Sequence, residues 1–295
     1  MSKKIMLIIA GIILALTILF AVSVQIARVL LGTTEAGLTD KPGVGLVEVK
    51  GMIIDSRETV RQLRYFLKKD TIKAVVLRVD SPGGVVAPSQ EISDEVRKFA
   101  AKKKIIVSMG SLAASGGYYI SAPATLIYAN PGTITASIGV ILKLSNIEGL
   151  MDKIGIKSYT LKTGKFKDSG SPFRKLSPAD RAMLQAVIDN THEQFVRAVA
   201  AGRKLPVEEV RKIADGRILS GEQAKALKLV DRLGTLQDAI EEAGRLAGIK
   251  GEPEVIQAPK KKLNYLDLLV DGMEGKFSGT LRSAVGGMQL RYEAE

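Results

Sequence analysis

Short apolar runs rich in β-branched residues alternate with helical patterns along most of this chain. The apolar runs predict strands over residues 45–49, 74–79, 105–109, 126–129 and 159–161. Helical spacing of apolar residues predicts helices over residues 59–67, 89–101, 179–201, 207–214, 221–227 and 236–246. Strands that alternate with helices form βαβ units, whose strands are parallel. The sequence therefore predicts an α/β fold built on a parallel sheet.

The side-chain inventory excludes several kinds of catalytic site. The 295 residues include no cysteine and one histidine, His192, so disulfides, thiolate catalysis and multi-histidine metal sites are ruled out. His192 lies within a helical pattern, where we expect a solvated or capped helix histidine. We accordingly expect no metal and no cofactor, and a reaction that uses other side chains.

The charge balance is basic, with 43 Lys and Arg against 31 Asp and Glu and a formal net charge of +12. The basic residues are dispersed, and aromatic residues make up 5% of the chain, so the pattern lacks an aromatic platform for stacking bases. We therefore expect no nucleic-acid partner.

An uncharged run of 20 residues, 5–24, lies near the N-terminus. A helix of this length spans roughly 30 Å, the thickness of the hydrocarbon core of a bilayer, and the run is longer than the apolar part of a cleaved signal peptide. Lys3 and Lys4 precede it, which favours a cytoplasmic N-terminus. We predict a single-pass protein of the cytoplasmic (inner) membrane with an extracytoplasmic body.

Composition divides the chain into four predicted segments. Residues 29–43 read as a linker that ends in Lys41-Pro42-Gly43, and the residues after Gly251 are rich in Pro, Lys and Gly. The predicted segments are 1–28, an N-terminal stub and transmembrane signal-anchor; 29–43, a linker; 44–250, the folded domain; and 251–295, a peripheral extension.

Two turns between predicted elements carry groups suited to acyl-transfer chemistry. In Ser81-Pro82-Gly83-Gly84, the glycines let the backbone approach a ligand, although a plain tight turn has the same pattern. Ser115 follows a predicted strand among residues too small to cover it, with the N–H of Gly116 beside it for a developing oxyanion. Because Ala113 stands where GxSxG requires glycine, a structural N-cap explains Ser115 equally well.

Three lysines follow the predicted 159–161 strand, namely Lys162, Lys165 and Lys167. A serine nucleophile without a usable histidine needs another base, and a lysine serves when burial lowers its pKa. Lys165 and Lys167 would share one face of a strand, so periodicity does not choose between them, and all three could equally be solvated surface lysines.

Four motifs in this order resemble those of the signal peptide peptidase A family, Ser/Lys proteases related to the Clp proteases and crotonases. The resemblance covers residues 44–248 and rests on 81–84, 109–120, 135–140 and 163–168. It implies a Clp/crotonase-type fold of stacked ββα units and degradation of cleaved signal peptides at the membrane. It also implies a homo-oligomer in which neighbouring subunits share each site.

The resemblance further implies roles for individual residues. Ser115 would be the nucleophile and Lys167 the general base. The N–H groups of Gly83 and Gly116 would form the oxyanion hole, and Ser137 would hydrogen-bond the lysine. Two other hypotheses stay open at this point: a crotonase-like acyl-CoA enzyme, and a membrane scaffold that has lost catalysis. Ala136 stands where many family members carry glycine.

Overall fold

The computed structural model describes residues 3–30, 42–259 and 290–294, and the chain divides into two compact units. The first unit contains helix α1 (Lys3–Leu30). In the described part of the chain, no helix reaches the length and apolar character needed to cross a membrane. The membrane span over residues 5–24 stays a prediction from the sequence. The predicted linker at 29–43 lies mostly outside the described residues.

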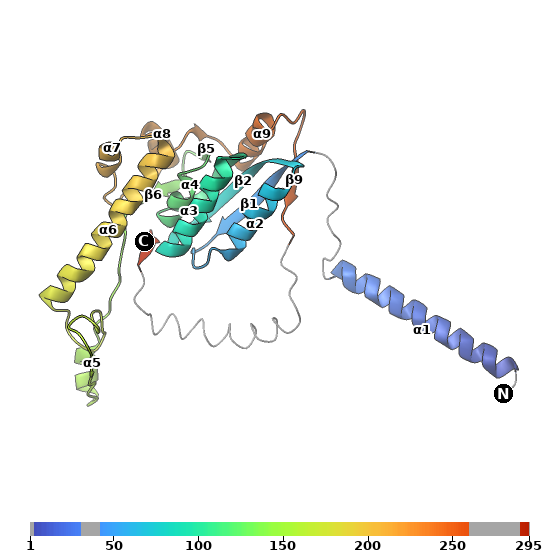
Figure 1. Ribbon diagram of the computed structural model, residues 1–295, viewed down its shortest axis with the longest axis horizontal. Coiled ribbons are helices and arrows are strands. Elements are labelled where there is room, and N and C mark those ends of the chain that lie inside the picture. Colours follow the sequence, from blue (N-terminus) through green and yellow to red (C-terminus); the bar gives the residue numbers. More distant parts are fainter. Residues whose placement is uncertain (1–2, 31–41, 260–289, 295) are drawn as a thin grey trace. The chain divides into compact units, whose positions relative to one another are not determined.

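The second unit is built around a largely parallel sheet of eight strands (Figure 1). The strands are β1 (Gly43–Lys50), β2 (Ile72–Ser81), β4 (Lys104–Ala114), β5 (Leu126–Ala129), β6 (Ile134–Ala136), β7 (Ile218–Ser220), β8 (Arg232–Leu233) and β9 (Glu254–Gln257). They follow the order β7-β6-β4-β2-β1-β9, with β5 pairing with both β4 and β8, and the β6–β7 pair is antiparallel. The predicted α/β class is confirmed, and the 126–129 strand is found at its predicted bounds.

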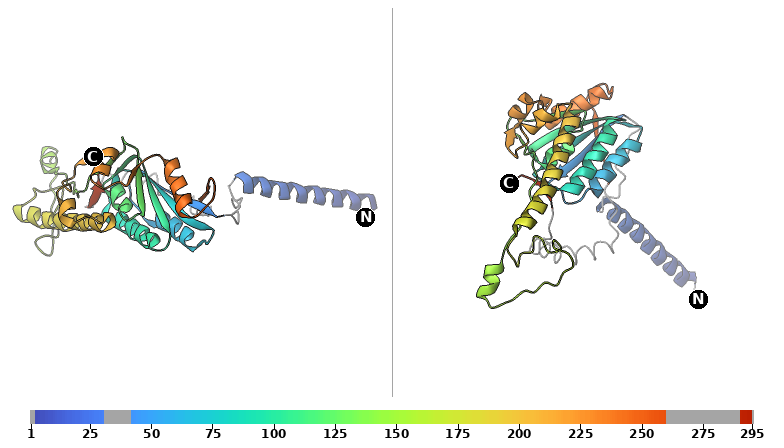
Figure 2. Two further views of the ribbon diagram at one scale, coloured as in Figure 1. Left: turned by 90° about the horizontal axis from the view of Figure 1, so that it is seen from above. Right: turned by 60° about the vertical axis from the view of Figure 1, so that its left-hand side comes forward.

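Helices cover both faces of this sheet. Alternate residues of β2 point to opposite sides: Val75 and Leu77 join the larger core, while Ala74 and Val76 join the smaller one. The larger core is closed by α2 (Arg57–Lys68), α3 (Val86–Ala100), α4 (Gly116–Ser121) and α6 (Pro178–Arg203). The smaller core lies under α9 (Leu236–Leu246), on the other face (Figure 2). Burial on both faces explains why β2 and β4 are almost continuously apolar.

Helix starts follow their sequence signals closely. Ser177 caps α6 through its side chain, Pro178 occupies the first turn, and Asp180 completes a capping box. A capping box, without the proline, also begins α8 (Gly221–Ala226) and α9, while α7 (Val207–Arg211) is shorter than predicted.

The predicted strand at 159–161 is wrong. Residues 142–177, here called the arm, contain the short helix α5 (Glu148–Lys153) and otherwise irregular backbone, and they extend away from the sheet (Figure 1). Tyr159 is 88% exposed, and Leu161 is fully exposed. Apolar residues in this segment therefore have no strand among the described residues to pair with, which is why an apolar run did not produce a strand.

A second, two-stranded sheet joins distant parts of the sequence. Strand β3 (Gly83–Val85) pairs antiparallel with β10 (Arg291–Glu293), which belongs to the C-terminal segment. On the opposite edge of β3, the N–H of Ile53 donates to Gly83 O, and the N–H of Val85 donates to Ile53 O, both at 2.8 Å. Strand β10 thus lies directly beside the glycine turn that the sequence singled out.

Candidate active site

Ser115 occupies a strained turn between β4 and α4. Its φ of 51° and ψ of −114° lie outside the regions that L-residues favour, and it is 1% exposed. Although Ser115 is the N-cap residue of α4, its side chain makes no capping bond, and Oγ has no hydrogen-bond partner among the described residues. The structural explanation of this serine as a helix cap therefore fails, because the hydroxyl satisfies none of the helix N–H groups.

Ala136 and Ser137 lie beside Ser115 and have unusual backbone conformations too. The N–H of Ser115 donates to Ala136 O at 2.7 Å, and the φ angles of Ala136 and Ser137 are 63° and 51°. The N–H of Ser137 donates to Arg217 O at 2.9 Å, which holds the segment in place. Three non-glycine residues with positive φ thus meet at one point, a concentration of strain typical of functional sites.

The two glycine turns face each other at this point. A methyl group on Gly83 would lie 2.5 Å from Gly116 N and 1.9 Å from Tyr292 O, so all three residues meet without side chains between them. The N–H of Gly83 itself donates to Ser81 Oγ at 3.1 Å. Gly83 therefore uses its N–H within its own turn, and its role as an oxyanion donor stays a prediction.

The register of β10 directs the N–H of Gly84 towards Tyr292. The N–H of Val86 donates to Leu290 O at 3.2 Å, and the N–H of Ala294 donates to Pro82 O at 2.8 Å. These two bonds flank the Gly84–Tyr292 pair, which the alternation of an antiparallel ladder makes a hydrogen-bonding pair. The N–H of Gly84 therefore faces the same carbonyl that lies beside Gly116 N.

Strand β10 is bound on both edges as an extended peptide would be. Besides its pairing with β3, Arg291 exchanges both backbone hydrogen bonds with Ile141, at 3.1 and 3.2 Å. Alternate side chains therefore point into and away from the protein, and Tyr292 is the one that points in. The groove between β3 and Ile141 accepts an extended backbone.

Tyr292 fills an aromatic pocket. Its ring stacks on Tyr119 with centroids 4.9 Å apart and contacts Phe195 at 4.6 Å, and it is fully buried. Its hydroxyl donates to Thr191 O at 3.3 Å, and burial raises the pKa of this phenol. Because Tyr119 is on α4, four residues after Ser115, the pocket is built onto the same helix that begins at the serine.

A cavity of about 480 Å³ adjoins Ser137. Its walls include His192, Asp189, Asp215 and Glu293. His192 Nε2 is buried and, within the described part of the chain, has no hydrogen-bond partner, so the expectation of a solvated or capped histidine is wrong for this atom. Arg217 holds the pKa of Asp215 down to about 2, so this wall stays anionic.

Lys167 lies on the arm and is exposed. Its side chain has no hydrogen-bond or ion-pair partner among the described residues, and within this chain it makes no bond to Ser115. Lys165 extends over the Phe166 ring at 5.3 Å from the centroid. One copy of the chain thus brings together Ser115, Gly116, Gly83 and Ser137, but not the predicted base.

Comparisons with known proteins agree with this arrangement. A model of peptidase family S49 matches residues 97–250, more than half of the chain, and a Clp protease model matches residues 50–133. The chain belongs to peptidase family S49. The S49 domain thus has a mixed α/β, Clp protease-like fold, and the family assignment selects a peptidase over an acyl-CoA enzyme.

Individual relatives of this S49 protein are named as proteases. A candidate protease of Synechocystis sp. is 44% identical over 76% of this chain and 82% of its own length. One from Methanocaldococcus jannaschii is 42% identical, over 69% of this chain and 65% of its own. A candidate signal peptide peptidase SppA of Enterococcus faecium is 37% identical, over 71% and 64%. The last two alignments leave about a third of each relative uncovered.

Sequence reasoning missed several residues that the structure places at this candidate site. Nothing in the pattern of residues 290–294 indicated that Tyr292 lies beside Ser115, because the pairing of β10 with β3 joins segments about 200 residues apart. Gly84 was not named as a donor, although it belongs to the same turn as Gly83. In the described residues, no cluster of three or more His, Asp or Glu side chains is placed to hold a metal ion.

Proposed function

We propose that this S49 peptidase is a serine endopeptidase in which Ser115 is the nucleophile and Lys167 of a second copy is the general base. One observation carries the proposal: the Ser115 hydroxyl is buried, sits on a strained turn and is bonded to nothing in the described structure. A polar group in that state costs stability, and a substrate and a base would each give it a partner.

The reaction follows from the groups around the serine. A neutral lysine amine accepts the proton of Ser115 Oγ as this oxygen attacks the scissile carbonyl carbon. The carbonyl oxygen becomes an oxyanion, stabilised by the N–H groups of Gly84 and Gly116. The protonated lysine then gives its proton to the leaving amine, and water releases the acyl group from Ser115 by the same path.

Two features support a base supplied by another copy. Lys167 is exposed on the arm, and apolar side chains exposed on the same arm would be covered by a neighbouring subunit. These side chains are Leu144, Leu150, Ile154, Ile156, Tyr159, Leu161, Phe166 and Phe173. The cavity of about 480 Å³ beside Ser137 leaves room for a side chain from another copy to enter.

The substrates we propose are apolar peptides, among them cleaved signal peptides. The groove beside β3 binds an extended backbone on both edges, and the pocket of Tyr119 and Phe195 accepts a large apolar or aromatic side chain. Backbone pairing gives such a site affinity for many sequences, while the pocket selects the residue before the cleaved bond. Tyr292 occupies that position in the chain's own C-terminal strand.

The assignment is tested by hydrolysis of an apolar, signal-peptide-like substrate by the full chain and three variants. Ser115→Ala and Lys167→Ala are each expected to lower kcat by at least about 100-fold, with folding and subunit assembly unchanged. Lys165→Ala is the matched control and is expected to keep its activity. If Lys165→Ala lost activity and Lys167→Ala kept it, the base would be Lys165. Activity in Ser115→Ala would refute the serine mechanism.

Sharing of the site between copies is tested by mixing the two inactive variants. If each site takes its serine from one subunit and its lysine from another, an equal mixture regains activity at about one quarter of the sites, because half of the subunits carry each intact residue. If both residues act within one chain, the mixture stays inactive.

Membrane attachment through residues 5–24 stays a prediction from the sequence, together with an extracytoplasmic domain on the cytoplasmic (inner) membrane. It is tested by expressing the full chain and a chain without residues 2–28, and extracting the membranes with alkaline carbonate. Retention of the full chain in the membrane pellet, and release of the shortened one, is the result that attachment predicts.

A further inference from the structure

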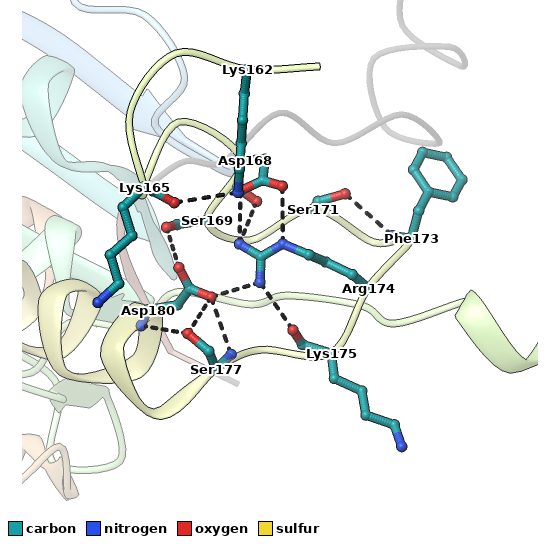
Figure 3. A network of polar contacts seen from close by, with 10 residues as sticks. All are labelled: Lys162, Lys165, Asp168, Ser169, Ser171, Phe173, Arg174, Lys175, Ser177 and Asp180. Atoms are coloured by element: carbon teal, nitrogen blue, oxygen red, sulfur yellow. Dashed lines mark hydrogen bonds and ion pairs between the residues drawn. The ribbon is translucent and has the colours of Figure 1, made fainter. Parts of the chain in front are cut away.

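A charged network ties the segment that carries Lys167 to the start of α6 (Figure 3). Asp168, the residue after Lys167, accepts two hydrogen bonds from Arg174, from Nε at 3.0 Å and from Nη2 at 2.8 Å. The third nitrogen of the same guanidinium, Nη1, donates to Asp180 Oδ2 at 2.6 Å. One arginine therefore bridges two carboxylates that are 12 residues apart in sequence.

Asp180 is held firmly in the fold, so it gives Arg174 a fixed partner. It is 2% exposed and lies in the first turn of α6, where Ser177 and Asp180 cap the helix reciprocally. Asp180 also accepts hydrogen bonds from the hydroxyls of Ser169, at 2.5 Å, and Ser177, at 2.7 Å. Because α6 packs into the larger core through Phe195, Val196 and Val199, Arg174 connects the arm to a fixed part of the fold.

The other end of the network closes the loop around Lys167. Lys162 Nζ forms an ion pair with Asp168 and donates to Lys165 O at 3.3 Å. The Asp168 carboxylate is thus held between two cations, Arg174 and Lys162, and these hold its pKa well below the usual range. Asp168 therefore stays ionised and engaged, although it is the nearest carboxylate to Lys167 in sequence.

We propose that Arg174 is a positioning residue for Lys167. By binding Asp168 to α6, it fixes the backbone from which Lys167 projects and keeps the Asp168 carboxylate away from the lysine amine. This inference rests on the proposed function, in which Lys167 is the general base of a site in another copy. It explains why an exposed arm with irregular backbone carries three groups ion-paired with one another or with Asp180 of α6, around a lysine that has no partner among the described residues.

The geometry favours arginine over lysine at position 174. A guanidinium binds two carboxylates at once through its fork of N–H groups, whereas an ammonium is a single point charge. Arg174→Lys should therefore keep one of the two contacts, and Arg174→Gln should keep neither charge interaction. The matched control is Arg211→Gln, because Arg211 also bridges two carboxylates, those of Glu208 and Glu193, but away from the arm.

The test measures kcat and KM across pH for these three variants of the full chain, beside Lys167→Ala. Arg174→Gln should lower kcat by about 100-fold, as expected for a misplaced catalytic group, with KM changed by less than about twofold. Arg174→Lys should fall between this variant and the wild type, and Arg211→Gln should match the wild type.

The pH profile separates positioning from a structural role. In Arg174→Gln, the released Asp168 carboxylate would favour a protonated amine beside it, so the acidic limb of the kcat/KM profile should move to higher pH. The double variant Asp168→Asn with Arg174→Gln should move it back. The other charged groups of this segment, Lys162, Lys165, Lys175 and Asp180, are the same in all of these proteins.

Two results would overturn the inference while leaving the proposed base intact. One is an Arg174→Gln enzyme with wild-type kcat and pH profile, in a protein that Lys167→Ala inactivates. The other is a loss of activity that matches a loss of folded, assembled protein, with the acidic limb unmoved. Full activity in Lys167→Ala would instead refute the proposed base, and the role of Arg174 with it.

Discussion

The backbone N–H of Ser115 donates to the carbonyl of Ala136 at 2.7 Å, and both residues have a positive φ. This bond joins the turn before α4 to the end of β6, where β4 and β6 pair. The strained serine turn is therefore supported by a second strained turn. Strain of this kind persists only where the surrounding structure holds it, here through the sheet.

Ala136→Gly should be nearly neutral for stability, although the side chain is buried. Glycine adopts a positive φ without strain, which stabilises the folded state. This gain offsets two losses: the buried methyl group is removed, and the unfolded chain gains conformational entropy. We expect a free energy of unfolding within about 0.5 kcal/mol of the wild type. Ala74→Gly, at a fully buried position of β2 with ordinary backbone, should lose about 1.5 kcal/mol. If Ala136→Gly and Ala74→Gly lost the same free energy of unfolding in urea, the backbone at Ala136 would not be strained.

Ser115→Ala should stabilise the fold as it removes activity. In the unassembled chain, where no base from another copy reaches the site, the buried hydroxyl has no partner among the described residues, so its removal should raise the free energy of unfolding by about 1 kcal/mol. Ser121→Ala is the matched control on α4, because Ser121 Oγ is buried and donates to Gly117 O at 2.7 Å. That variant should lose about 1 kcal/mol. Destabilisation of both variants in urea unfolding of the unassembled chain would mean that the Ser115 hydroxyl has a bonding partner within its own chain.

Removal of the C-terminal strand should open the groove to other peptides. Residues 290–294 occupy the edge of β3 and the Tyr119 pocket, so a substrate has to displace them. A chain that ends at residue 289 should therefore show a KM lowered by about fivefold or more at unchanged kcat, since no site is lost to the competing strand. A peptide with the sequence of residues 290–295 should inhibit it. Tyr65→Ala, which removes a tyrosine of α2 outside the groove, serves as the control for lost aromatic packing. An unchanged KM would mean that β10 does not compete with substrate.

The sequence predicted the parts of the fold that depend on local signals. Strands β2 and β4 are apolar on both faces, and the start of α6 carries Ser177, Pro178 and Asp180 together, so periodicity and capping chemistry located them within a few residues. The serine turn was found for the same reason, because Ser115 and Gly116 directly follow an apolar strand. That the Ser115 side chain does not cap α4 became evident only from the hydrogen bonds of the structure.

The features that sequence analysis missed depend on contacts between distant segments. The apolar run at 159–161 predicts a strand, but a strand needs a neighbour, and the arm has none in the described structure. Tyr292 and Arg174 carry no local signal at all: one acts through pairing with β3, and the other through carboxylates at 168 and 180. His192 was expected to be capped or solvated because a helical pattern does not reveal which face borders a cavity.

The attachment of the arm to α6 should weaken in acid, because Asp180 stabilises it only while its carboxylate is ionised. Hydrogen bonds from Arg174, Ser169 and Ser177 hold the pKa of this carboxyl far below its usual range. The unfolded chain takes up a proton near pH 4, while the folded chain resists it, so the stability from Asp180 is complete above that pH and declines as the pH falls below it. In urea unfolding, the difference in midpoint between the wild type and Asp180→Asn should therefore be largest at pH 5 to 7 and shrink towards pH 3.

Asp189→Asn is the control. It removes an exposed carboxylate of the same helix, one that accepts a hydrogen bond from Gln185, and it should leave the midpoint unchanged. A difference between the wild type and Asp180→Asn that persists at pH 3 would show that Asp180 acts through packing rather than through its charge.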